Sequence, residues 1–544
     1  MISLRLNPLL LVSVTIAALV ALPVVSVLTN ILSGGTGATW SHLAATVLPD
    51  YVANTLLLCF AVGAGVLLIG VATAWLTAMH DFPGRRVFEW ALVLPMAMPA
   101  YVLAYVYTDF LQFVGPLQTF LRELFGWNKA DYWFPEVRSL GSAAAMFVFV
   151  LYPYVYLLAR TAFIERTSGM LEASRTLGLG PWRSFFRVSL PLARPAVAAG
   201  ASLALMETLA DYGTVSYFGV QTFTTGIYRA WFSLGDRIAA AQLAAALLAF
   251  VVLLLLIEWH SRGRARFNDT TARHRQFPGR RLTGGRAWLA TATCALPLGI
   301  GFLLPACLLL RLALTDSETP LGGHFAALAR NSFLLAGLTA LLALALAVLL
   351  AYGARLSRGM FAPALNRLVG LGYAVPGSVI AVGVLIPVTR LDHWLAEQWQ
   401  HWYGDNPGLL LTGGIAALVY AYLVRFLAVA LQAVGTSLAK ITRSMDDAAR
   451  SLGLGQTATL RRVHLPILRG SLFTACLLVF VDVMKELPAT LVMRPFDFDT
   501  LATQAYTLAS DERLAEAASV SLAIVAVGLL PLILLSHQIS RQRR

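Results

Sequence analysis

The sequence predicts an all-α polytopic membrane protein with about twelve transmembrane helices, and three observations support this fold class. First, 58% of the 544 residues are hydrophobic and only 13% are charged, whereas about a quarter of the residues of a soluble domain are charged. Second, the apolar residues come in runs of about 20, the length that a helix needs to cross a bilayer. Third, the second half of the chain repeats motifs of the first half, which predicts two parallel six-helix repeats.

Twelve apolar runs qualify as membrane spans. In chain order we expect them at 9–32, 56–79, 87–107, 143–159, 195–217, 238–258, 287–313, 333–354, 366–388, 409–432, 469–492 and 515–537. We interpret 9–32 as a retained first helix, because its apolar run is longer than the core of a signal peptide and no clear small-residue cleavage site follows it.

Arginine in the connections predicts the orientation of the spans. The loop 33–55 has no Arg or Lys, whereas 259–286 contains eight Arg and the loops 160–194 and 433–468 are also rich in Arg. Because basic loops stay in the cytoplasm, we expect both termini there. The net charge of +13 is then explained by loops that face acidic membrane lipids, and not by a nucleic-acid partner.

The repeat divides the chain into two halves joined by a linker. Asn54 matches Asn331 and Pro99 matches Pro376, both at offset 277. Later pairs match at offset 275, namely Leu190-Pro191 with Leu465-Pro466, and Phe223 and Thr225 with Phe498 and Thr500. We predict a first repeat at 1–258, an Arg-rich cytoplasmic linker at 259–286 and a second repeat at 287–544. Each repeat holds six spans, so both have one orientation and are related by a pseudo-twofold axis along the membrane normal.

A cytoplasmic motif occurs once in each repeat, near 168–192 and near 443–467. The first copy contains EASRTLGLG and the second DAARSLGLG. We expect Gly178 to end a short helix (171–177) in the left-handed conformation, and Pro181 to begin a second short helix.

The helix starts of the two copies are predicted differently. In the second copy, Ser444 followed by Asp447 resembles a capping box. Gly169 takes the equivalent N-cap position of the first copy, where glycine is tolerated. Ordinary amphipathic linkers are the simplest alternative, but two matches at one offset argue against them because loops otherwise vary freely.

This motif resembles the cytoplasmic signature of ABC-type importer permeases. The residues that carry the resemblance are Glu172, Ala173, Gly178, Pro191, Asp447, Ala448, Gly453 and Pro466. Ser174 and Asp447 replace the usual Ala and Glu. The resemblance implies the type I importer fold, and a short helix in each repeat that docks on an ATPase subunit and couples its closure to transport.

The chain lacks a nucleotide site of its own. A P-loop needs a Lys directly after a Gly, but none of Lys129, Lys440 and Lys485 follows a Gly. We therefore expect no enzyme activity and no cofactor bound by this chain. The resemblance implies a homodimeric ATPase as a separate partner, which would bind ATP and Mg.

One acidic pair interrupts the fifth span of each repeat. Glu207 and Asp211 lie four residues apart in METLADYG, and at offset 275 they match Asp482 and Glu486. Residues four apart share one helix face, so the four carboxylates could converge on the pseudo-twofold axis. Ionisable side chains inside a membrane mark functional sites by default.

The position of the acids suggests a cation. If the helix starts near Pro195, Asp211 lies roughly 24 Å above its start, in the outer half of the bilayer. Gly213 and Pro488 follow the second acids and predict a kink or helix end there. Acids at a helix C-terminus face the negative end of the dipole, and a cation would relieve this penalty.

The ligand types around the acids favour a hard cation. Tyr212 and Tyr217 add phenol oxygens, whereas His and Cys are absent from this stretch. The tentative metal-contacting set is Glu207, Asp211, Asp482 and Glu486, with Tyr212 also on the substrate pathway. Two alternatives stay open: Lys485 could pair with Asp482 or Glu486, or the acids could line a vestibule that meets an external binding protein.

The stretches 207–231 and 485–506 are similar to those of fused permeases for ferric iron in the bacterial inner membrane. This resemblance implies alternating access and a periplasmic binding protein that delivers Fe3+. Thiamine or another small cation or cofactor is the alternative cargo. A secondary transporter driven by an ion gradient fits the acids but not the paired cytoplasmic motifs, and a structural scaffold explains neither feature.

Overall fold

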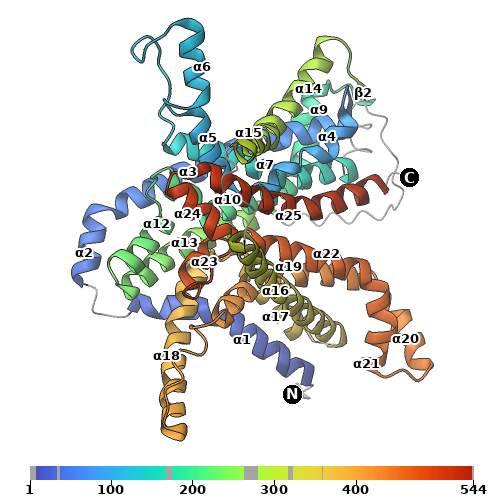
Figure 1. Cartoon of the computed structure of the whole chain (residues 1–544). Coiled ribbons are helices and arrows are strands. Elements are labelled where there is room, and N and C mark those ends of the chain that lie inside the picture. The colour runs from blue at the N-terminus through green and yellow to red at the C-terminus, as the bar shows by residue number, and fades with distance from the viewer. Residues whose placement is uncertain are drawn as a thin grey trace. The chain divides into compact units, whose positions relative to one another are not determined.

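The computed structural model describes residues 8–32, 37–166, 174, 176–262, 280–315, 323–357 and 359–541 (Figure 1). Helices make up nearly all of its regular structure. They are α1 (Pro8–Thr29), α2 (Gly37–Thr46), α3 (Leu48–Met79), α4 (Arg85–Ala91), α5 (Ala100–Leu111), α6 (Pro116–Phe125), α7 (Leu140–Arg166), α9 (Pro181–Ser184), α10 (Leu190–Ala210), α11 (Gly213–Tyr217), α12 (Phe223–Tyr228), α13 (Arg237–Arg262), α14 (Gly285–Leu298), α15 (Leu304–Thr315), α16 (Gly323–Leu356), α17 (Phe361–Gly370), α18 (Gly377–Tyr403), α19 (Ala416–Ala439), α20 (Arg443–Ser451), α21 (Gln456–Thr459), α22 (Leu465–Met484), α23 (Pro488–Met493), α24 (Leu501–Ser510) and α25 (Leu514–Arg541).

Shorter turns join several of these helices. Tight 3-10 turns occur at Asn30–Leu32, Leu94–Ala97 and Leu371–Ala374. Wider π-helical turns occur at Phe185–Ser189, Arg229–Ser233, Gly299–Leu303 and Leu460–His464. The strands β1 (His80–Asp81) and β2 (Arg280–Arg281) form a parallel pair in which His80 is opposite Arg280. This pair ties the end of the predicted linker to the connection after α3.

The described part of the chain contains eleven helices that are long and apolar enough to cross a membrane, and up to twelve if one bent pair counts as a span. Each overlaps one of the predicted spans. The predicted fold class, a polytopic helical membrane protein, is confirmed.

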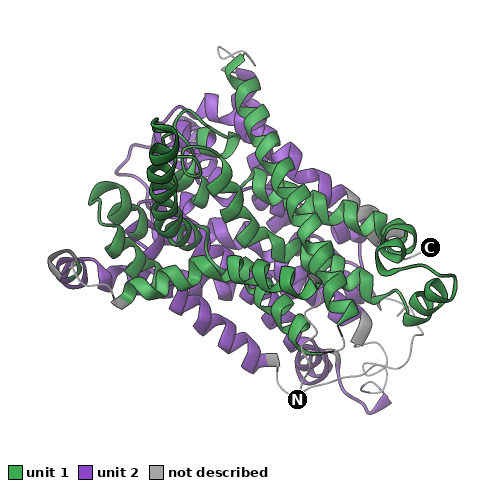
Figure 2. Ribbon diagram, turned by 90° about the horizontal axis from the view of Figure 1, so that it is seen from below, with its two compact units in different colours: residues 1–40, 227–245, 321–504 green, residues 41–226, 246–320, 505–544 purple. Residues whose placement is uncertain are grey.

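The chain forms two compact units (Figure 2). Unit 1 comprises residues 1–40, 227–245 and 321–504, and unit 2 comprises residues 41–226, 246–320 and 505–544. In unit 2, α3 packs against α7 and α10; in unit 1, the repeat-equivalent helices α16, α19 and α22 pack together in the same way. Each core is thus built from the second, fourth and fifth spans of one repeat.

Small residues let the core helices of unit 2 approach closely. A Cβ atom on Gly70 of α3 would lie 2.6 Å from Cβ of Val155, and one on Gly200 of α10 would lie 2.7 Å from Cα of the same residue. Val155 of α7 therefore sits against glycines of both neighbours. Contacts through small residues are the usual means by which membrane helices pack without a hydrophobic driving force.

The two units exchange helices between the sequence repeats. Helix α1 of the first repeat packs in unit 1 against α16, α17, α18 and α19, all from the second repeat. Helices α14, α15 and α25 of the second repeat pack in unit 2 against elements of the first. The boundaries 1–258 and 287–544 therefore stay a prediction about the duplicated sequence, and the compact units cut across them.

Two predicted spans are broken at proline, which the hydropathy pattern did not indicate. In place of a continuous span at 87–107, the segments Arg85–Ala97 and Ala100–Phe125 meet at an angle of 90°. In place of 366–388, α17 and a 3-10 turn precede α18, which begins after Pro376. Pro99 and Pro376 have φ of −62° and −58° with extended ψ. Residues that precede a proline avoid the helical region, so each preceding helix ends although the apolar sequence continues.

Candidate functional site

The fifth span of the first repeat breaks at the predicted acids. Helix α10 ends at Ala210, and Asp211 has an extended backbone with ψ of 138°. Its Oδ1 atom accepts a hydrogen bond of 2.8 Å from the backbone N–H of Thr214, at the start of α11. The Thr224 hydroxyl donates to the Asp211 carbonyl at 2.9 Å. The helix break predicted before Gly213 is confirmed.

The second repeat breaks at the equivalent position. Helix α22 ends at Met484, and Glu486 precedes α23. Its Oε1 accepts from the N–H of Ala489 at 2.9 Å, and its Oε2 accepts from the N–H and hydroxyl of Thr490 at 3.1 and 2.8 Å. Glu486 is buried, with 5% of its surface exposed.

These contacts correct the dipole argument drawn from the sequence. Asp211 and Glu486 do follow the C-terminal ends of α10 and α22. Their carboxylates, however, accept N–H groups at the starts of α11 and α23, where the helix dipole favours negative charge. A cation is therefore not needed to relieve a dipole penalty.

The remaining acid of the second repeat has a basic partner. Asp482 of α22 lies 3.2 Å from Nζ of Lys485, so one of the ion pairs weighed from the sequence is confirmed. Glu207 is half-buried on α10. Tyr212 lies beside the break in unit 2, with its ring centroid 5.8 Å from that of Tyr506.

An arginine that sequence reasoning missed pairs with Glu486. Nη1 of Arg425, on α19, lies 3.6 Å from Oε1 of Glu486, and the two side chains are 9% and 2% exposed. Gly377, at the start of α18, makes room for the pair, because a Cβ atom there would lie 2.6 Å from Oε1 of Glu486. The signal in the sequence was an arginine within the apolar run 416–431, since such charges mark functional or paired positions.

The acids fall into two groups, with Glu207 and Asp211 in unit 2 and Asp482 and Glu486 in unit 1. Among the residues that the structure describes, no three or more His, Cys, Asp or Glu side chains lie close enough together to hold a metal ion. The convergence of all four carboxylates stays a prediction.

The glycine in the cytoplasmic motif has the same backbone conformation in both repeats. Gly178 has φ of 79° and Gly453 has φ of 77°, so the left-handed helix end predicted for Gly178 is confirmed and is repeated in the second copy. Leu179 N–H donates to Ser174 O and Leu454 N–H donates to Ala449 O, both at 3.0 Å, which is the Schellman arrangement.

Each left-handed glycine follows an exposed leucine. Leu177 and Leu452 occupy the same repeat position and are 82% and 81% exposed. Because large apolar side chains at matched exposed positions indicate a contact surface, these leucines are candidates for partner binding that the sequence alone did not single out. Their apolar character and their position one residue before the glycine were the available signals.

The other predicted motif residues have different surroundings. Glu172, Ala173 and Gly169 lie outside the described residues. Asp447 pairs with Arg450 at the surface, and Ala448 is exposed. Pro191 and Pro466 lie in the first turns of α10 and α22. As predicted, Pro181 begins a short helix, α9.

The predicted capping box at Ser444 is wrong. The N-cap of α20 is Thr442, and no side chain caps the helix. Ser444 lies inside the first turn, where its hydroxyl is 2.8 Å from that of Thr442. The helix starts two residues earlier because Thr442 already has the extended conformation typical of an N-cap, with ψ of 152°.

An ionic clamp joins α20 to the rest of unit 1; we use this name for Arg355, Asp446 and His464. Asp446 of α20 accepts from Nε of Arg355, at the end of α16, at 3.0 Å. Its other oxygen lies 2.7 Å from Nε2 of His464, in the π-helical turn before α22. Nη1 of Arg355 also donates to Leu438 O at 2.8 Å. One carboxylate thus links the motif helix to two spans.

In the first repeat, an aromatic contact and a hydrogen bond are described near the corresponding turn. Trp75, the counterpart of Tyr352, contacts Phe185 with ring centroids 4.7 Å apart. Ser174 and Ser184 are joined by a hydrogen bond of 2.5 Å. The contacts described for the two copies of the motif therefore differ.

The segment after span five shows a register that differs from the predicted one. The N–H of Thr222 donates to Thr225 Oγ1 and that of Thr500 donates to Thr503 Oγ1, both at 2.9 Å. These equivalent turns match at offset 278, so the predicted match of Phe223 and Thr225 with Phe498 and Thr500 at offset 275 is wrong. The second copy therefore has three more residues than the first between the break and this turn. The insertion was missed because Phe and Thr residues also match at offset 275.

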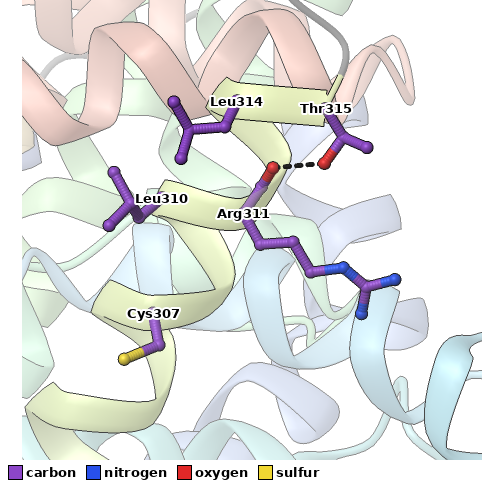
Figure 3. Close-up of a pocket in the computed structure, with 5 residues that line it drawn as sticks. All are labelled: Cys307, Leu310, Arg311, Leu314 and Thr315. Atoms are coloured by element: carbon purple, nitrogen blue, oxygen red, sulfur yellow. Dashed lines mark hydrogen bonds between the residues drawn. The ribbon is translucent and has the colours of Figure 1, made fainter.

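A surface cavity lies away from these residues. It has a volume of about 450 Å³ and is lined by Cys307, Leu310, Arg311, Leu314 and Thr315 of α15 (Figure 3). None of the predicted site residues lines it.

Comparisons with known proteins extend these observations. Residues 66–263 match the family described as "Binding-protein-dependent transport system inner membrane component". The chain is 26% identical over 490 residues to the Fe(3+)-transport system permease protein FbpB 2 of Haemophilus influenzae, covering 89% of each protein. It is 31% identical over 204 residues to the molybdenum transport system permease protein ModB of Escherichia coli K12, covering 36% of this chain and 86% of that one. The ferric transport system permease protein FbpB of Actinobacillus pleuropneumoniae is 21% identical over 478 residues, covering 84% of this chain and 66% of that one.

Proposed function

The chain belongs to the family of binding-protein-dependent transport system inner membrane components, and from that premise we propose that it is the membrane-spanning subunit of an ATP-driven importer of ferric iron. The family consists of multi-pass transport subunits and not of enzymes, and it works with an ATPase and a periplasmic binding protein. In this proposal the ATPase drives a conformational change of the membrane subunit, which opens to the two sides of the membrane in turn.

The single observation that carries the proposal is the duplicated cytoplasmic motif. Gly178 and Gly453 share one left-handed conformation, and each presents an exposed leucine beside it. Two equivalent docking points suit two copies of one ATPase subunit, since a homodimer offers the same surface twice. The motif positions Glu172, Ala173, Gly178, Pro191, Asp447, Ala448, Gly453 and Pro466 would then transmit closure of the ATPase, which would itself bind ATP and Mg.

The membrane orientation follows the distribution of arginine. With both termini in the cytoplasm, the basic loops face the ATPase and the breaks after α10 and α22 lie toward the external side. Helix α10 has 21 residues, a rise of about 32 Å, which is enough to cross the hydrocarbon core. Cargo released by the binding protein would meet these breaks first.

Ferric iron is favoured as the cargo by two arguments. The relatives that match most of this chain are named for iron transport, whereas the molybdenum relative matches about a third of it. Acidic side chains at both breaks also suit a hard cation better than an anion. We propose that Glu207, Asp211, Tyr212, Asp482 and Glu486 line the pathway, with the four carboxylates as transient contacts for Fe3+ as cargo.

The test is an ATPase-stimulation screen. The chain is reconstituted in liposomes with its ATPase, and ATP hydrolysis is measured with binding proteins loaded with Fe3+, thiamine or molybdate. We expect stimulation by the ferric-loaded protein alone. Stimulation by the thiamine-loaded protein alone would overturn the cargo. Uptake in liposomes without the ATPase would overturn the ATP-driven mechanism in favour of an ion gradient.

A further inference from the structure

Two short helices, α12 and α24, follow the broken fifth span of each repeat. Their starts are anchored in the same way: Nδ2 of Asn54 donates to Gln221 O at 2.9 Å, and Nδ2 of Asn331 donates to Asp499 O at 3.1 Å. Both asparagines begin the apolar part of the second span of their own repeat. Each short helix is thus fixed at its start to its own repeat.

The ends of these helices contact the opposite repeat. Tyr228, at the end of α12, donates its hydroxyl to the carbonyl of Pro488, the first residue of α23. At offset 278, Tyr228 corresponds to Tyr506 of α24. The Tyr506 hydroxyl donates to Ser216 Oγ, in α11, at 3.0 Å. Each tyrosine therefore binds the helix that follows the break of the other repeat's fifth span.

A boundary between the compact units falls inside each of the two short helices. Residues 223–226 of α12 belong to unit 2 and its last two residues to unit 1. Helix α24 begins in unit 1 and, from Ala505 onward, belongs to unit 2. Each tyrosine contact lies inside a single unit, yet each helix carries the chain from one unit into the other. Two occurrences of one arrangement, at one offset, argue for a common role.

We propose that Tyr228 and Tyr506 are positioning residues that latch the external helix breaks, and that both latches must release when the transporter opens to the outside. The proposal rests on the proposed function, because it needs an ATP-driven cycle. Helices α12 and α24 are each fixed at the start to their own repeat and at the end to the other repeat, so each helix links the two repeats. Opening at α11 or α23 then has to move a helix that is held by the other repeat, so the two breaks open together.

The latch is expected to act by making the latched conformation more stable than the open one. A hydrogen bond made in the latched state alone favours that state, and a loaded binding protein must supply the free energy to open it. Loss of one such bond should shift the population toward the open state about fivefold. ATP hydrolysis in the absence of binding protein should rise accordingly.

The test uses the full chain with its ATPase in proteoliposomes and compares Tyr228→Phe, Tyr506→Phe and the double variant. These changes keep the rings, including the contact between Tyr212 and Tyr506. We expect basal ATP hydrolysis to rise about fivefold in each single variant, and iron transported per ATP to fall. Ser216→Ala removes the acceptor of the Tyr506 hydroxyl and should also raise basal hydrolysis.

Matched controls remove a tyrosine hydroxyl bond elsewhere. Tyr420 donates to Leu19 O in unit 1 and Tyr107 donates to Ile300 O in unit 2, both at 2.6 Å. Tyr420→Phe and Tyr107→Phe should leave basal hydrolysis unchanged. Basal hydrolysis that is unchanged or lowered in the latch variants, or raised equally in the controls, would overturn the latch. If ferric-loaded binding protein failed to stimulate the native complex, the cargo would be wrong, while the comparison of basal rates would still test the latch.

Discussion

The four carboxylates at the broken spans have different partners, and this makes them unequal. Glu486 accepts three hydrogen bonds from Ala489 and Thr490 and pairs with the buried Arg425. Asp482 pairs with the partly exposed Lys485. Asp211 accepts hydrogen bonds from Thr214 and Val215, at the start of α11. Glu486 is therefore the acid for which a buried ion pair is described, and we expect its loss to affect stability as well as transport.

Amide substitution should separate these roles. Glu207→Gln, Asp211→Asn and Asp482→Asn should lower iron uptake into proteoliposomes at least tenfold while assembly with the ATPase is preserved. Glu486→Gln should also lower stability by about 3 kcal/mol, because it removes one partner of a buried ion pair. Uptake and thermal unfolding of the purified complex measure the two effects.

Arg425→Met is the matched control for the ion pair. Combined with Glu486→Gln, it removes both charges and should recover most of the stability, but not the uptake. Native uptake in all four single amide variants would contradict a pathway role for these acids.

Residue-level prediction from the sequence succeeded where a local signal existed. The acids, their spacing and the breaks that follow them were predictable from METLADYG and DVMKELP. The partner of Glu486 was not, since Arg425 lies in the preceding span of the repeat, and pairing between separate spans depends on how α19 packs against α22 and α23. The contacts of the second acid with the next helix were missed because the sequence was interpreted from the preceding helix alone.

At the scale of elements, the second motif helix, α20, is connected to the spans by charge. The ionic clamp ties α20 to α16 and to the turn before α22 through one carboxylate. Hydrogen bonds that involve charged groups contribute about 1.5–3 kcal/mol each. A movement of α20 should therefore also displace α22, which carries Asp482 and leads to Glu486.

Asp446→Asn should weaken this connection. We expect the stimulation of ATP hydrolysis by loaded binding protein to fall several-fold, while binding of the ATPase changes little, because the exposed Leu452 is untouched. Hydrogen exchange of the amides in α20 should rise as the helix loosens.

Glu516→Gln is the control for the loss of an acidic partner, since Glu516 of α25 pairs at 2.6 Å with Arg513, the residue before that helix, away from the motif. It should leave stimulation unchanged. Equal effects of the two substitutions would show that the clamp has no special part in coupling.

Prolines explain where element prediction succeeded and where it failed. Apolar runs predicted a span that overlaps each membrane-length helix, because burial in lipid and burial in protein select the same side chains. The predicted starts of Trp182–Ala210, Gly377–Tyr403 and Gln456–Met484 nevertheless differ from the observed ones by more than ten residues. The breaks at Pro99 and Pro376 were missed since the hydrophobicity on both sides is continuous. Both prolines had been matched as a repeated pair, and a repeated proline inside an apolar run was the signal for a repeated bend.

At the scale of the whole molecule, each compact unit is completed by helices from the other sequence repeat. The contacts are close: a Cβ atom on Gly383 of α18 would lie 2.3 Å from Pro23 O in α1, and one on Gly528 of α25 would lie 2.9 Å from Ala97 O. A repeat expressed by sequence boundaries alone would lack these partners.

Gly383→Val and Gly528→Val should therefore loosen the opposite repeat. Overpacking of such contacts costs about 1–3 kcal/mol, so amide exchange should rise in α1 for the first variant and in the turn Leu94–Ala97 for the second. Hydrogen exchange with mass spectrometry measures both. Gly435→Val in α19 is the control, because nothing lies within 4 Å of a Cβ atom there. Increased exchange confined to the repeat that carries the substitution would contradict the exchanged arrangement.

The connection between the two sequence repeats runs from α13 to β2. Helix α13 ends at Arg262 in unit 2, and the chain resumes in the described structure at β2, which pairs with β1 in the same unit. Both ends of this connection thus belong to unit 2. Doubling the length of such a connection costs only about 0.6 kcal/mol of closure entropy. The length of the connection can therefore change with little effect on the packing of the helices that it joins.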